Sequence, residues 1–126
     1  MNMETGTTEL APERDLCGRL IGVIQSRQQL KPLCVSLNTL GIREVEVFDG
    51  PAGVTKLEKW KKGVSQYFFG DMEGEMLRRY VHAVRNDHIV FAAVVEAEAF
   101  SNAAETARTQ GATEMTHFGQ FVIANA

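Results

Sequence analysis

The chain lacks the patterns by which many enzymes and membrane proteins are recognised. Its 126 residues include only 2 cysteines and 3 histidines, and no apolar run approaches the ~20 residues of a membrane helix. Nucleotide-binding glycine loops and the His-Glu-x-x-His, Gly-x-Ser-x-Gly and Cys-x-x-Cys patterns are absent from the sequence. We therefore exclude the enzyme classes that these motifs define, and we expect no metal site, no cofactor and no membrane span.

The charge balance is slightly acidic, with a formal net charge of −3. Nucleic-acid-binding domains more often carry a basic surface, so nucleic acid is not an expected partner. The hydrophobic fraction of 44% and the charged fraction of 23% are typical of one globular domain with its own core.

The first 13 residues have neither the basic segment nor the apolar segment of a signal peptide. We expect a disordered tail over residues 1–13, a single domain over residues 14–126 and a cytoplasmic location. Cys17 and Cys34 are then expected to be small buried thiols rather than a disulfide, because the cytoplasm is reducing.

A faint internal repeat is the most informative pattern. Residues 21–50 align without a gap on residues 91–120, and each copy predicts an apolar strand, an amphipathic helix closed by glycine and an alternating strand. The four identical pairs are Thr39/Thr109, Gly41/Gly111, Glu44/Glu114 and Phe48/Phe118.

The repeat divides the domain into three parts: repeat one (16–50), an insertion (51–87) and repeat two (88–126). The strands are expected at 16–25, 44–48, 88–96 and 113–125, and the repeat helices at about 31–40 and 98–110. In the insertion, the pattern predicts a short helix at 55–62, an aromatic loop at 65–70 and a clearer helix at 72–85.

Two β-α-β repeats of this kind predict a ferredoxin-like α+β fold. The apolar strands at 16–25 and 88–96 belong in the centre of a four-stranded antiparallel sheet, and the alternating strands belong at its edges. Right-handed crossovers would place both repeat helices on one face of the sheet.

The second face of this sheet is then apolar as well. Phe48, Phe118 and Val122 should point away from the repeat helices, and a large exposed apolar patch usually marks an interface. Either the insertion or a second subunit must cover the face. We favour a homodimer that uses these three residues.

His117 is the leading catalytic candidate, because it aligns with Val47 of the first repeat. Histidine can act as a general base near neutral pH, although a satisfied core histidine is the simpler interpretation. Tyr80 or Arg79 could orient a substrate in a cavity between sheet and helix, and His82 lies on the same predicted helix.

Two other segments could bind a ligand. Asp49, Gly50 and Gly53 lie in a glycine-rich stretch that could present backbone amides to an anion, or could be a plain turn. Trp60 lies among lysines, a combination that can bind nucleic acid by stacking or can be a solvated face over a packed ring. These lysines are Lys56, Lys59, Lys61 and Lys62.

Two long segments carry a resemblance to a known family. Leu20–Gly50, with the helix end Leu-Asn-Thr-Leu-Gly at 37–41, and Tyr80–Phe118 together resemble the heat-induced general stress proteins of the 17M type. The resemblance covers about two-thirds of the chain and departs from the family at 54–69, where lysines and aromatics replace a Gly/Ala-rich linker. It implies a small bacterial stress-linked protein without an established reaction, and it transfers no catalytic residues.

Our preferred hypothesis is a non-enzymatic, oligomeric cytoplasmic domain that binds a protein partner or a small ligand in a stress response. The alternative is a small ferredoxin-like enzyme whose pocket between sheet and helices uses His117. The substrate, and whether there is catalysis at all, does not follow from the sequence.

Overall fold

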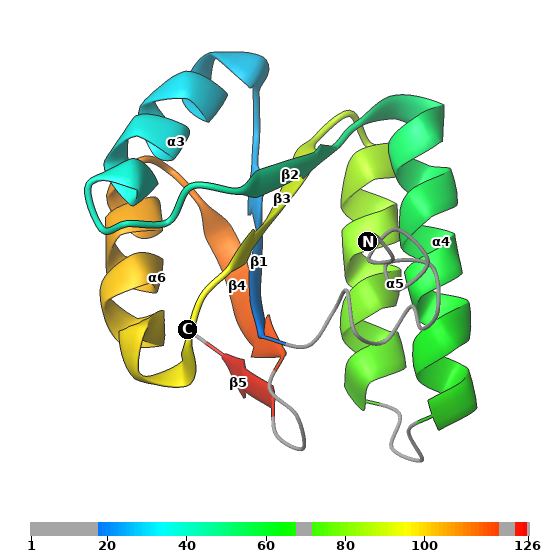
Figure 1. Ribbon diagram of the computed structural model, residues 1–126. Helices are drawn as coiled ribbons and strands as arrows, with labels where there is room; N and C mark the ends of the chain where they lie inside the picture. Colours follow the sequence, from blue (N-terminus) through cyan, green and yellow to red (C-terminus); the bar gives the residue numbers. More distant parts are fainter. Residues whose placement is uncertain (1–17, 68–71, 119–122, 126) are drawn as a thin grey trace, which may run out of the picture.

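The computed structural model describes residues 18–67, 72–118 and 123–125 (Figure 1). The predicted tail, Cys17 and Val122 lie outside these ranges. The strands are β1 (Arg19–Ile24), β2 (Val45–Phe48), β3 (Ile89–Val94), β4 (Thr113–Phe118) and β5 (Ile123–Asn125). The helices are α3 (Leu30–Asn38), α4 (Gly50–Tyr67), α5 (Met72–Arg85) and α6 (Phe100–Thr109), with single 3-10 turns at Arg27–Gln29 and Ala97–Ala99.

The strands form one sheet in the order β2-β3-β1-β4-β5, and every neighbouring pair is antiparallel. The prediction of a mixed α+β domain with an antiparallel sheet is thus confirmed. The strands β2, β3, β1 and β4 correspond to the four predicted strands, and β5 adds a fifth at the edge of the sheet. The strands β1 and β3 lie side by side near its centre and are almost entirely buried. Their apolar character on both faces is what the sequence pattern indicated.

One predicted strand is wrong. The single strand expected at 113–125 is two strands, because Phe118 pairs with Ile123 and the chain reverses between them. Gly119 interrupts the run of larger side chains in the sequence, and glycine weakens a strand interior. The strand β4 is consequently not at the edge of the sheet, since β5 lies outside it.

The same order of elements occurs twice. The strands β1 and β3 begin at residues 19 and 89, and each is followed by a 3-10 turn, a helix and a further strand. Both repeat helices end at a glycine with positive φ, Gly41 at +86° and Gly111 at +93°. The next amide donates back to the carbonyl of Leu37 or Ala107, 3.1 Å away in each case. These glycine caps confirm the predicted helix ends.

The helices α3 and α6 cover one face of the sheet, as expected (Figure 1). The helix α6 presents three alanines to the core, which lets its backbone approach the sheet closely. The fully buried or nearly buried side chains on this side include Leu20, Ile24, Leu33, Leu37, Phe91, Ala103, Ala104, Ala107 and Met115.

The insertion covers the opposite face as a helical hairpin, α4 and α5 (Figure 1). The helix α4 is a single helix of 18 residues, whereas the sequence predicted a glycine-rich loop or turn at 49–53 and a short helix at 55–62. The predicted aromatic loop at 65–70 is helical up to Tyr67, and its remaining residues lie outside the described ranges. The glycines and Pro51 suggested a turn, but proline is also well suited to the first turn of a helix, where no intrahelical donor is needed.

Phe48 is therefore a core residue rather than an interface residue, and the corresponding prediction is wrong. Its side chain is 0% exposed, and the Trp60 ring meets it edge-on with 5.0 Å between centroids. The helix α4 crosses close to Phe48 because Gly53 has no side chain: a Cβ there would lie 2.8 Å from the Phe48 carbonyl carbon. The side chain of Phe118 lies outside what the structure describes.

Replacing Phe48 distinguishes a core role from an interface role. We predict that Phe48→Ala lowers the free energy of unfolding by about 3–5 kcal/mol, because it leaves a cavity beside Trp60. Chemical denaturation measures this change. Val35→Ala on α3 is the control, since Val35 is 54% exposed and its loss should change stability by less than about 0.5 kcal/mol. Normal stability of Phe48→Ala together with a changed subunit number would contradict the core assignment.

Candidate functional site

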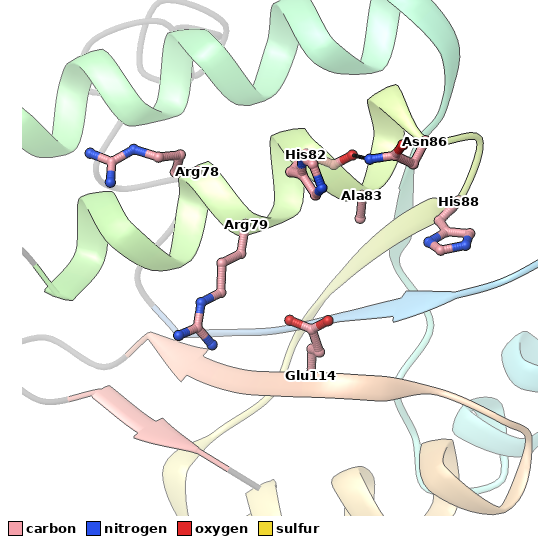
Figure 2. A pocket seen from close by; sticks show the side chains of 7 residues that line it. All are labelled: Arg78, Arg79, His82, Ala83, Asn86, His88 and Glu114. Atoms are coloured by element: carbon pink, nitrogen blue, oxygen red, sulfur yellow. Dashed lines mark hydrogen bonds between the residues drawn. The ribbon is translucent and has the colours of Figure 1, made fainter.

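A cavity of about 960 Å³ opens between α5 and β4, and Figure 2 shows the side chains that line it. We call it the α5–β4 groove. Its residues come from α5, from the segment that joins α5 to β3, and from the middle of β4. They are Arg78, Arg79, His82, Ala83, Asn86, His88 and Glu114.

Two charged groups in the groove form no ion pair among the described residues. Arg79 reaches from α5 toward β4, and Glu114 reaches from β4 toward α5 (Figure 2). Among the described residues, the Arg79 guanidinium and the Glu114 carboxylate form no ion pair and no side-chain hydrogen bond. By contrast, Arg78 binds Glu75 at 2.6 Å. Arg79 and Glu114 are thus the charges that a ligand would meet.

Two imidazoles add polar contacts to the same groove. His82 lies one helical turn beyond Arg78 and Arg79 on α5, and the amide of Asn86 donates to the His82 carbonyl at 2.8 Å. His88 is placed by the end of the helix, where its backbone N–H donates to the Ala83 carbonyl at 3.0 Å. A neutral imidazole has one donor and one acceptor nitrogen, so both rings can hydrogen-bond a ligand.

Glu114 points into the groove because β4 is bulged at this position. Ile21 faces Thr116 and Val23 faces Thr113, so two steps along β1 match three steps along β4. The extra residue of β4 is accommodated at Glu114. Its φ of +52° lies in the left-handed region that non-glycine residues rarely adopt. Such bulges re-aim side chains and are common beside functional sites.

The hydroxyl of Tyr80 lies behind this bulge. It lies 2.7 Å from the Glu114 carbonyl, 2.9 Å from the Thr116 hydroxyl and 3.2 Å from the Ile21 carbonyl. Tyr80 is 0% exposed, and this burial raises the pKa of its phenol well above the ordinary value. The phenol therefore stays protonated and donates to a backbone carbonyl. The structure makes Tyr80 a residue that positions β4, rather than one that orients a substrate directly.

His117 lies in the core and does not line the groove. It is 6% exposed, its Nε2 donates to the Val95 carbonyl at 2.7 Å, and its ring packs 5.3 Å from that of Phe100 on α6. The bond to Val95 and the packing against Phe100 fix the ring within the core, away from the groove. The geometry matches a satisfied core histidine, and His117 is no longer our candidate base.

The predicted ligand-binding set is not gathered in one place. Asp49 and Gly50 line a second cavity of about 350 Å³, where Asp49 pairs with Arg27. The Gly53 amide donates to the Asp49 carbonyl at 3.0 Å within the first turn of α4, so it is not free for an anion. Trp60 is 5% exposed, with Arg19 stacked 5.7 Å from its ring centroid. Neither Gly53 nor Trp60 presents a binding surface.

Two further classes of site are absent from the described part of the chain. It contains no group of three or more His, Cys, Asp or Glu side chains placed to hold a metal ion. None of its helices combines the length and apolar character needed to cross a bilayer.

Burial raises the pKa of the Cys34 thiol, which makes it a poor nucleophile.

Arg79 and His82 were predicted from the sequence as candidate site residues, whereas Glu114 on the β4 side of the groove was not. Glu114 is one of the four residues identical between the repeats, which was a signal that could have been followed. Nothing in the sequence indicates its positive φ, because glutamate has no preference for that conformation. For His88 the sequence predicted only that it begins a strand, with no role in a site.

A glycine substitution tests whether the backbone at Glu114 is strained. We predict that Glu114→Gly raises the free energy of unfolding by up to about 1 kcal/mol, because glycine adopts positive φ without the steric cost of a side chain. Asp87→Gly is the matched control, since Asp87 has a φ of +70° and does not line the groove. Both variants should be stabilised in chemical denaturation. A loss of more than about 1 kcal/mol in Glu114→Gly alone would contradict the strained conformation.

Comparison of the chain with protein-family models, curated proteins and solved structures finds no match. The resemblance to the 17M-type stress proteins therefore stays a prediction.

Proposed function

We propose that this domain binds a small charged molecule in the α5–β4 groove, with Arg79 holding an anionic group of the ligand. The observation that carries the proposal is the Arg79 guanidinium, which has no ion-pair partner among the described residues and lines one cavity with His82 and His88. A guanidinium presents its donors in a planar fork that matches carboxylate or phosphate oxygens.

The volume of the groove supports a small-molecule ligand. At about 960 Å³ it falls within the range of small-molecule pockets, and a few convergent polar groups line it, as such sites require. The lining also includes the buried Ala83, which offers a short apolar floor between the charged side chains.

Dimerisation through the sheet is not part of this proposal. The expected dimer depended on an uncovered apolar face, and α4 and α5 of the same chain cover that face. A protein partner, a stress role and a cytoplasmic location stay predictions from the sequence.

Catalysis is likewise not part of the proposal. The enzyme hypothesis assigned the base to His117, whose Nε2 is bound to a backbone carbonyl in the core. Binding alone accounts for unpaired charges in an open groove, and it needs no activated group.

We also propose that the domain is of the ferredoxin-like type. The order β2-β3-β1-β4 supports this classification, as does a crossover helix following both β1 and β3. The α4–α5 hairpin and β5 would then be additions, and the groove lies where the added hairpin meets β4.

Ligand titration followed by amide NMR tests the proposed function. Inorganic phosphate, small carboxylates and amino acids are added in turn to the labelled protein. We expect chemical-shift changes that cluster at residues 78–88 and 114. Arg79→Gln should weaken the tightest probe about tenfold or more, because a hydrogen bond to a charged group contributes about 1.5–3 kcal/mol.

Two controls make this result specific. Arg108→Gln removes the same charge from α6, where Arg108 pairs with Glu105, and it should leave the affinity unchanged. His117→Gln keeps a donor for the Val95 carbonyl and should also bind normally. Absence of shifts in the groove, or equal losses in Arg79→Gln and Arg108→Gln, would refute binding at Arg79.

A further inference from the structure

The α5–β4 groove contains opposite charges that the protein does not pair with each other. The Arg79 guanidinium comes from α5 and the Glu114 carboxylate from β4, and neither has an ion-pair partner among the described residues. Elsewhere in the domain, oppositely charged side chains form ion pairs, as Arg85 does with Glu58 and Arg19 with Glu46. The Arg79 guanidinium and the Glu114 carboxylate thus line one cavity without forming an ion pair with any described residue.

A ligand with a single charge would be poorly matched to this groove. An anion bound at Arg79 would be close to the Glu114 carboxylate, and a cation bound at Glu114 would be close to the Arg79 guanidinium. Like charges placed near each other cost free energy, and sites use such repulsion to reject wrong ligands. A molecule that carries both charges gains from both side chains.

We infer that the ligand is a small zwitterion, with its anionic group on Arg79 and its ammonium group on Glu114. An α-amino acid is the simplest molecule of this class. His82 and His88 line the same groove and can hydrogen-bond the rest of the ligand. This inference rests on the proposed function and adds the second charge to it.

The backbone at Glu114 supports a dedicated role for this carboxylate. Glutamate at a φ of +52° is strained, and strain of this kind persists where the surrounding structure holds it, often at ligand sites. The Tyr80 hydroxyl holds the Glu114 carbonyl at 2.7 Å from behind. A partly buried hydrogen bond thus fixes the backbone from which the exposed Glu114 carboxylate extends into the groove.

Three probes of one carbon skeleton test the inference. Norvaline carries both charges, butylamine lacks the carboxylate, and pentanoate lacks the ammonium group. Each is titrated at neutral pH into the full chain, with dissociation constants taken from amide shifts at residues 78–88 and 114. We expect norvaline to bind at least about tenfold more tightly than either single-charge probe, since each charge-assisted contact contributes to affinity.

Two isosteric variants assign each charge to its side chain. In Glu114→Gln, the preference for norvaline over pentanoate should disappear. In Arg79→Gln, the preference for norvaline over butylamine should disappear. Both side chains are exposed, so both variants are expected to fold, and thermal unfolding verifies this.

The outcomes separate this inference from the proposed function. If pentanoate binds in the groove as tightly as norvaline, the zwitterion is refuted while binding at Arg79 stands. If norvaline binds best but Glu114→Gln changes nothing, the role of Glu114 is refuted. If none of the three probes shifts the groove residues, the inference fails. The proposed function fails as well if inorganic phosphate and the other small carboxylates also leave these residues unshifted.

Discussion

The hydrogen bonds of the buried Tyr80 hydroxyl organise much of this structure. A phenol that is 0% exposed must find partners, because an unsatisfied buried hydroxyl costs about 1–3 kcal/mol. Here the partners are the Glu114 carbonyl, the Thr116 hydroxyl and the Ile21 carbonyl, so one atom of α5 is tied to both β1 and β4. We infer that this contact holds the bulge in β4 and the conformation of Glu114, whose side chain lines the groove.

The α4–α5 hairpin thereby has two roles. Its apolar side closes the second face of the sheet over Phe48 and Val90, which removes the need for a subunit at that face. Its polar side forms one wall of the groove through Arg79 and His82. A single insertion thus covers the core and forms part of the candidate site. Along α5, core residues such as Tyr80 and Val81 lie next in sequence to the groove residues Arg79 and His82.

The sequence predicted the elements that depend on local patterns. Continuous apolar runs indicated β1 and β3. Apolar side chains at helical spacing predicted α5 with both of its bounds. Gly41 and Gly111 marked the ends of α3 and α6. The start of α4 was missed because Gly-Pro is found both in turns and at helix beginnings.

The site was harder to predict, because its geometry depends on contacts between distant segments. Arg79 and His82 were recognisable as polar residues on a helix, but only packing against β4 decides which side chains they face. The Glu114 carbonyl is hydrogen-bonded by Tyr80, 34 positions earlier in the chain, and no local pattern encodes that bond. The burial of His117 likewise depends on Phe100 and on the Val95 carbonyl.

The most direct measurement is the set of backbone chemical shifts of residues 113–117 in Tyr80→Phe, compared with the unmodified protein. Removing this one hydroxyl should release Glu114 from positive φ, with changed shifts at Glu114 and Thr116 and with α5 still helical. Shifts at Glu114 that are the same in both proteins would contradict the claim that Tyr80 holds the bulge and presents the carboxylate to the groove.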